Sequence, residues 1–143
     1  MGAAIAYGAY RRSEVETLTP RDLLVKMFDG LERFIEQAAL AMDNHHLEMA
    51  TKNTRRIRDI LFELQATLNF DAGGEVAKNL DALYTFMIRE VIDAGASKDS
   101  QRVRQLQRIV RPLKEGWKGV PDAHAHTSSL TGDAKQNIIN MRG

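Results

Sequence analysis

The chain has 143 residues and an almost balanced charge, with 20 lysines and arginines against 19 aspartates and glutamates. A formal net charge of +1 gives no overall field that would favour nucleic acid or an anionic membrane as partner. The absence of cysteine excludes a disulfide framework and a thiolate zinc site. Aromatic residues make up only 6%, which favours a single helical domain over a β-sandwich.

The sequence shows no segment that would direct it to or through a membrane. No stretch approaches the roughly 20 consecutive apolar residues of a membrane-spanning helix. The start of the chain has neither the basic residues nor the long apolar run of a secretory signal. We therefore expect a cytoplasmic protein with no membrane insertion.

Residues 1–18 form a lead segment that is apolar in places but has no helical period. Its apolar side chains include Ile5, Tyr7, Tyr10 and Leu18, too many for a disordered tail. We expect an extended N-terminal arm that lies across the rest of the domain. The arm is either a fixed cover for apolar surface or a displaceable lid over a groove that receives another chain. The four residues are therefore candidate partner-binding residues.

A first helix is expected from Pro20 to about Met42. Thr19 suits the capping position, Pro20 the first helical position, and Asp22 the position three residues after the cap. Apolar residues then recur at steps of three and four, which places them on one face of the helix. They are Leu24, Met27, Phe28, Leu31, Phe34, Ile35, Ala38 and Met42.

Two further apolar stripes predict a second helix over residues 47–68 and a third over residues 76–94. Asn44 is expected to act as a cap between the first two helices, Gly73 and Gly74 to form a turn, and Gly95 to end the third helix. The second stripe is Leu47, Ala50, Thr54, Ile57, Ile60, Leu61, Leu64 and Leu68. The third stripe is Val76, Ala77, Leu80, Leu83, Tyr84, Met87, Val91 and Ala94.

A fourth helix is expected to start at Ser97 or Asp99 and to end before Pro121. Its stripe is Val103, Leu106, Ile109, Val110, Leu113 and Trp117. Pro112 lies inside this pattern and removes one backbone donor, so we expect the helix to bend or split there. Residues 1–121 are thus predicted to form an all-α domain, an antiparallel up-down-up-down four-helix bundle with the N-terminal arm.

Residues 122–143 are predicted to be a polar linker and tail. Asp133 suits the start of a short fifth helix that carries Ile138, Ile139 and Met141. A helix this short is not stable alone in water, so it must dock on another surface or fray.

The sequence lacks the usual marks of an enzyme or a metalloprotein. Ferritin-like di-metal sites need Glu-x-x-His pairs, and no histidine here has a glutamate three residues before it. His45 and His46 are expected to serve the end of the first helix, and His124 and His126 to lie in a solvated tail rather than hold a metal. No stripe position carries a buried acid or base suited to catalysis. We expect no catalytic residue, cofactor or metal site.

Charge is concentrated in the fourth helix, where residues 98–118 carry seven cations against two anions, a net charge of +5. Four of the cations lie opposite the apolar stripe. They are Arg104, Arg108, Arg111 and Lys118. This basic face is either a solvated face, a docking surface for an acidic protein, or a phosphate-binding surface. The lack of interleaved aromatic residues counts against nucleic acid, because bases need a stacking platform.

A series of short motifs runs from about residue 7 to residue 118. They are Tyr10, Thr17–Pro20, Leu23–Gly30, Asp59–Leu64, Leu68, Gly73–Leu80, Leu83–Tyr84 and Trp117. In this order and at this spacing they resemble the FliS family of flagellar export chaperones, in which a tyrosine segment precedes a Ser/Thr-Pro helix start and a Leu-Tyr-Asp/Asn-Gly run. The sequence departs from the pattern at Phe28 and Phe86, where tyrosine is common, and at Ala94–Ala96, which replaces an Ala-Asn turn.

The resemblance implies a helical bundle that acts as a cytoplasmic chaperone of flagellar type III export, and no enzyme activity. It implies binding of the disordered C-terminal region of flagellin, prevention of premature polymerisation, and delivery to an export-gate protein. Tyr7 and Tyr10 match the family's N-terminal arm, which is linked to client binding and gate docking. We expect a monomer or weak homodimer. One further hypothesis is that Ile138, Ile139 and Met141 dock in the client groove and imitate the client.

Two other functions stay open at this point. The first is an adaptor that binds nucleic acid or an acidic protein through the basic face of the fourth helix. The second is a structural subunit that oligomerises through its groove. The salt dependence of binding separates the first of these from an apolar chaperone, since phosphate contacts give a steep dependence.

Overall fold

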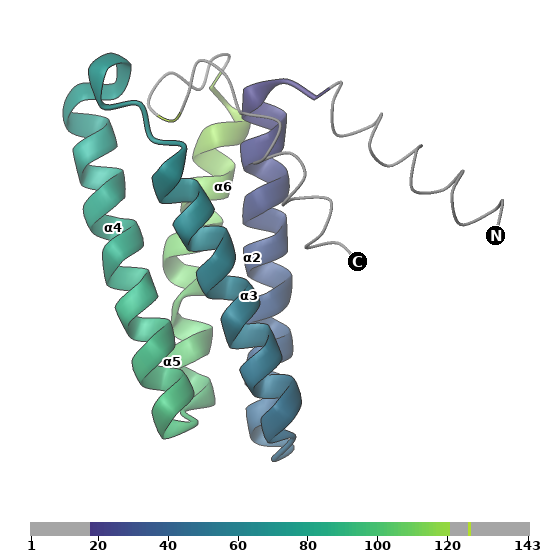
Figure 1. Cartoon of the computed structure of the whole chain (residues 1–143). Helices are drawn as coiled ribbons and strands as arrows, with labels where there is room; N and C mark the ends of the chain where they lie inside the picture. Colours follow the sequence, from purple (N-terminus) through teal and green to yellow (C-terminus); the bar gives the residue numbers. More distant parts are fainter. Residues whose placement is uncertain (1–17, 121–125, 127–143) are drawn as a thin grey trace, which may run out of the picture.

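The computed structural model describes residues 18–120 and His126, and its helices pack side by side as a bundle (Figure 1). The helices are α2 (Pro20–Asp43), α3 (Leu47–Ala66), α4 (Phe70–Ser97), α5 (Ser100–Gln105) and α6 (Gln107–Lys118). Helices α2 and α4 run in one direction, whereas α3 and the column formed by α5 and α6 run in the other. The described residues contain no strand. This confirms the predicted all-α antiparallel bundle; the expected fifth helix lies outside the described residues.

The start of α2 follows the predicted capping signal. The Thr19 hydroxyl oxygen accepts a hydrogen bond from the Asp22 backbone N–H at 3.1 Å, and Pro20 takes the first helical position. At the other end, the Asn44 side-chain amide donates to the Leu40 carbonyl at 2.9 Å. Asn44 therefore closes α2. It does not cap the start of α3, where His46 is the N-cap residue and makes no side-chain cap bond.

The glycine positions differ from the sequence-based expectation. Helix α4 begins before the glycine pair, because the Asn69 side chain accepts from the Ala72 N–H at 3.0 Å and caps the helix there. Gly74, at φ 51°, then bends the chain inside α4. Gly95 does not end the helix, which continues to Ser97 and stops at Lys98 in the left-handed conformation. The predicted stop at Gly95 is therefore wrong.

The fourth stripe is divided between α5 and α6. Asp99 caps α5 through a 3.1 Å hydrogen bond from the Arg102 backbone N–H, as expected. The helix splits at Leu106, ahead of Pro112, which itself lies inside α6. Pro112 has no N–H to offer the Arg108 carbonyl, which lies in the first turn of α6 next to the break. The helix is therefore divided, but six residues before the proline, and the bend or split expected at Pro112 itself is wrong.

The predicted stripes form the core, with a few exceptions. Helix α2 packs against α3, α5 and α6, whereas α4 packs mainly against α3 and α5. Fully buried side chains include Phe28 and Leu31 of α2, Leu64 of α3 and Val110 of α6. Each such side chain contributes about 1.5–3 kcal/mol by leaving water. The stripe residues Leu47 and Val76 are instead exposed.

Candidate functional site

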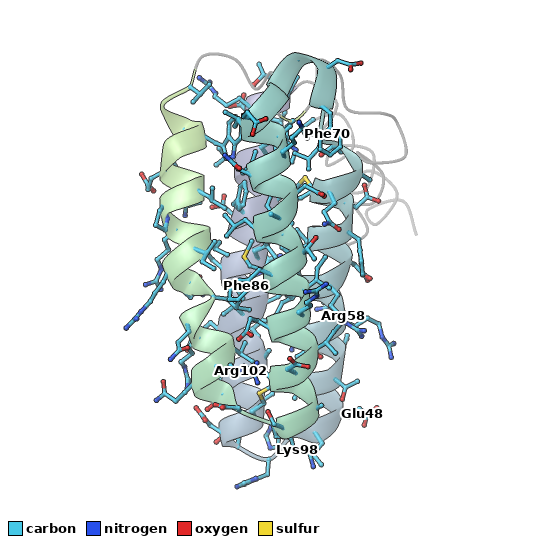
Figure 2. The ribbon with its side chains drawn as sticks, turned by 90° about the vertical axis from the view of Figure 1, so that its left-hand side faces the viewer. Glu48, Arg58, Phe70, Phe86, Lys98 and Arg102 are labelled. Atoms are coloured by element: carbon cyan, nitrogen blue, oxygen red, sulfur yellow. The ribbon has the colours of Figure 1, made fainter. Side chains whose placement is uncertain are left out.

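A groove of about 260 Å³ lies between α3 and α4, at the end of the bundle where α3 begins and α4 ends. We call it the α3–α4 groove. Its lining residues are Met42, Leu47, Ala50, Thr51, Thr54, Arg58, Val91, Ile92, Gly95, Ala96 and Lys98. Arg58 and Lys98, both labelled in Figure 2, are the two charged residues in this lining. The rest is apolar or small and neutral, which suits an apolar guest with a polar rim.

Small residues where the two helices approach create this groove. An added Cβ at Gly95 would lie 3.7 Å from the Thr54 Cγ2 atom, so the glycine faces α3 directly. Val91 and Ala50 are buried and form the floor. Leu47 and Ile92 are 45% and 46% exposed and keep apolar surface available at the mouth. Exposed apolar surface around a hollow is typical of a binding site.

The apolar surface continues around the start of α3. A second hollow of about 470 Å³ is lined by His46, Leu47, Glu48, Met49 and Lys52. Leu47 belongs to both hollows, and Met49 is also exposed. Leu47 and Met49 thus add exposed apolar surface at this end of the bundle, next to the polar His46, Glu48 and Lys52.

A second apolar surface lies on the other flank of α4. Figure 2 shows Phe86 on the side of α4 that faces the α5–α6 column. Leu83, Phe86 and Glu90 are spaced by three and four residues and so share one side of the helix. Glu90 binds Arg102 of α5 at 2.8 Å, which confirms where that side points. We call this surface the Phe86 strip; it comprises Val76, Leu83 and Phe86 of α4 with Ile109 and Leu113 of α6.

A polar cluster is buried around His126, next to the ends of α3 and α6. The His126 Nε2 atom lies 2.7 Å from the Tyr84 hydroxyl of α4, and its Nδ1 atom lies 2.8 Å from the Thr67 hydroxyl. The Trp117 ring of α6 contacts the imidazole edge-on, with centroids 5.7 Å apart. His126 is fully buried, so the expectation that it lies in a solvated tail is wrong.

The hydrogen bonds of the cluster determine the tautomer of His126. The Thr67 hydroxyl donates its proton to the Leu64 carbonyl at 3.0 Å, so its oxygen can only accept from the imidazole. The Nδ1 atom therefore carries the proton, and Nε2 accepts from the Tyr84 hydroxyl. Burial lowers the pKa of His126 to about 4 and raises the pKa of Tyr84 above its ordinary value. Both groups are neutral at pH 7.

Sequence reasoning missed His126 because nothing around it has a helical period. The one sequence feature that indicated a buried polar partner was Tyr84, a residue with a hydroxyl group at a position of the third apolar stripe. A buried hydroxyl needs a hydrogen-bond partner, and none of its stripe neighbours offers one.

The predicted basic face does not stay together as one free surface. Arg104 binds Asp43 of α2 at 2.7 Å and lies 3.8 Å from Glu36, so it joins α5 to α2. Lys118 pairs with Glu115 on its own helix at 3.3 Å. Arg108 and Arg111 are exposed, and neither forms an ion pair with any residue that the structure describes. They are the two cations of the face still open to an acidic partner.

The predicted partner-binding arm falls mostly outside the described residues. Ile5, Tyr7 and Tyr10 lie there, as do His124 and the apolar positions of the tail. Leu18 is described, and it is partly buried against the core.

Residues 18–120 and His126 show neither a metal-binding cluster nor a membrane-spanning helix. Within that part of the chain, no three histidine, aspartate or glutamate side chains are grouped so as to hold a metal ion. No helix there is long and apolar enough to cross a membrane.

A helical bundle with apolar surface on both flanks of one helix has the architecture of a protein-binding module. Residues 3–124 match the model of a family described as flagellar protein FliS. A flagellar secretion chaperone FliS of Bacillus subtilis is 30% identical over 78% of this chain and 83% of its own length. Its counterparts in Campylobacter jejuni and Vibrio cholerae are 30% and 29% identical, over 81% and 84% of this chain and 91% and 89% of theirs. The chain belongs to the FliS family.

Proposed function

We propose that the protein is a cytoplasmic flagellar export chaperone that binds the disordered C-terminal region of flagellin. In this role it prevents premature polymerisation of flagellin and assists its delivery to the export-gate protein. Family membership and the names of its relatives support the chaperone role. The observation that carries client binding is the apolar surface on both flanks of α4. The protein is thus a binding protein rather than an enzyme.

The two surfaces favour a disordered client over a globular one. The α3–α4 groove and the Phe86 strip lie on different sides of α4, so a rigid partner would cover only one of them. An unfolded segment can pass over α4 and fill both, and it can form short helices where its apolar residues meet the surface. We therefore propose that the client wraps around α4.

The energetics of the proposed complex call for an apolar contact that is larger than the cost of ordering the client. Ordering a disordered segment costs roughly 2–5 kcal/mol or more of the gross interaction energy. At about 25 cal/mol per Å² of apolar area, roughly 80–200 Å² must be buried to offset that cost alone. Half-exposed side chains such as Ile92, Met49 and Phe86 still have surface to lose.

Flagellin polymerisation tests the proposal directly. With an equimolar amount of this protein, light scattering by polymerising flagellin monomers should be suppressed, and a flagellin lacking its C-terminal region should give no complex by sedimentation. Unchanged polymerisation at a severalfold excess of the protein would contradict the proposal. Sedimentation also shows whether the free protein is a monomer or a weak homodimer.

The N-terminal arm carries a separate part of the proposal. Deleting residues 1–9 and measuring the affinity for a flagellin C-terminal peptide by calorimetry distinguishes its two roles. A lid predicts unchanged or tighter binding, since an open groove needs no displacement. About tenfold weaker binding would show that the arm is itself a contact surface.

An acidic protein remains the alternative partner, favoured by the two free cations Arg108 and Arg111. Binding through these side chains would weaken steeply with salt, whereas binding in the apolar groove would not. The double variant R108Q/R111Q therefore separates the two. It should abolish binding of an acidic protein and leave the affinity for the flagellin peptide unchanged.

A further inference from the structure

The contacts of His126 describe a small recognition site, which we call the His126 seat. It consists of the Thr67 hydroxyl after α3, the Tyr84 hydroxyl of α4 and the Trp117 ring of α6. Tyr84 donates to the occupant and Thr67 accepts from it, because the Thr67 proton is already given to the Leu64 carbonyl. The seat thus selects a flat group with one acceptor and one donor about an imidazole's width apart.

The seat adjoins the Phe86 strip along α6, where Trp117 lies one helical turn beyond Leu113 on the same side of the helix. On α4, Tyr84 follows Leu83 of the strip but is buried in the core. The residues of the seat lie within the part of the chain that matches the family, residues 3–124, whereas its occupant lies just beyond it. A client segment that follows the strip along α6 toward Trp117 therefore comes next to His126.

The interactions that keep His126 in the seat can be made equally by another group. Its two hydrogen bonds join neutral groups, and such bonds contribute only modestly because each has an equivalent in water. The ring contacts with Tyr84 and Trp117 add to them. A primary carboxamide satisfies the same pattern, since its oxygen accepts from Tyr84 and its NH₂ group donates to Thr67.

We propose that the seat is a shared site, filled by His126 in the free protein and by an asparagine or glutamine carboxamide of the client in the complex. His126 is then an internal competitor that lowers the apparent affinity for the client. This inference rests on the proposed function for its client, but the chemistry of the seat can be tested without one.

The first experiment measures thermal unfolding of H126G with small probes in millimolar concentration. Imidazole and acetamide each offer an acceptor and a donor and should raise the melting temperature of H126G but not that of the wild type. 1-Methylimidazole has no donor and should have no effect. Equal effects of all three probes, or none from imidazole and acetamide, would overturn the assignment of the seat.

The second experiment measures the affinity of a flagellin C-terminal peptide by calorimetry. If His126 fills the seat for about nine-tenths of the time, H126G should bind about tenfold more tightly than the wild type. H126Q keeps an acceptor and a donor and should bind like the wild type. H126M, of similar length without hydrogen-bonding groups, should behave like H126G and provides a second variant if the glycine change impairs folding.

The matched control is H124A, which removes an imidazole from the same segment and should leave peptide affinity unchanged. If both H126G and H126M keep their helicity and bind the peptide within twofold of the wild-type affinity, His126 does not compete with the client, and the proposal is overturned. Absence of peptide binding by every variant and by the wild type would instead contradict the proposed function, while the probe experiment would still decide the seat.

Discussion

The Tyr84 hydroxyl on α4 donates a 2.7 Å hydrogen bond to the Nε2 atom of His126, which joins residues 42 positions apart in the chain. The bond exists only while the imidazole is neutral, because a protonated Nε2 has no lone pair to accept with. Among the described residues, the imidazole's hydrogen-bond and ring partners are the neutral groups of Thr67, Tyr84 and Trp117.

This relationship predicts a pH dependence of stability. The pKa of His126 is about 4 in the folded protein against an ordinary value of 6.5, so between these values the unfolded chain binds more protons. Stability therefore rises with pH across that window, and the contribution is lost as the pH falls from 6.5 toward 4. Between pH 7 and pH 4.5 the loss is at most about 2.5 kcal/mol.

Urea unfolding of the wild type and H126Q at both pH values checks this. The carboxylates titrate in both proteins, so the expected observation is a larger decrease for the wild type than for H126Q. Equal decreases would show that His126 does not remain neutral and buried in that range.

A second prediction concerns Lys114, which joins α6 to α2. Its ammonium group lies 3.2 Å from Asp29 and 3.1 Å from Glu32, and only 14% of its side chain is exposed. One oxygen of the Glu32 carboxylate is already buried without a hydrogen-bond partner. Removing the charge of Lys114 would also take away the cation that pairs with the other oxygen. We expect K114M to lower the free energy of unfolding by about 1–3 kcal/mol.

The control for K114M is R111M, because Arg111 is exposed on the same helix and has no ion pair among the described residues. Its effect should stay within about 0.5 kcal/mol, as for most surface changes. Chemical denaturation of both variants would contradict the account if the two losses were equal.

The two glycines of α4 should respond to alanine with opposite signs. Gly95 has helical backbone geometry and room for a Cβ at ordinary contact distance from Thr54, so G95A should stabilise by about 0.5–1 kcal/mol. Gly74 has φ 51° and ψ −126°, a conformation open almost only to glycine, so G74A should cost about 1–3 kcal/mol. Thermal unfolding of the two variants measures both signs; a stabilising G74A would show that the bend is not needed.

The features that the sequence predicted correctly are those set by neighbours in the chain. Thr19 and Asp99 cap their helices because the donors they satisfy lie three residues away. The apolar stripes predicted the core for the same reason, since helical spacing alone decides which side chains share a face.

The features that the sequence did not predict depend on other helices. The sequence predicted that Gly95 ends the third helix, yet Gly95 lies where α4 approaches Thr54 of α3. The sequence predicted that Arg104 belongs to an open basic face, yet Arg104 forms an ion pair with Asp43 of α2. The α3–α4 groove and the His126 seat are likewise formed by residues distant in the chain, which no local pattern brings together.

The central claim is that a client chain binds the apolar flanks of α4, and a pair of matched variants tests it most directly. Ile92 borders the α3–α4 groove at 46% exposure, whereas Leu40 is 47% exposed on α2, outside both apolar surfaces. Titration calorimetry with the flagellin C-terminal peptide should show at least about tenfold weaker binding for I92D, because a buried carboxylate must be desolvated or neutralised. L40D should bind like the wild type. Equal affinities of I92D and the wild type, with both variants folded, would contradict the claim.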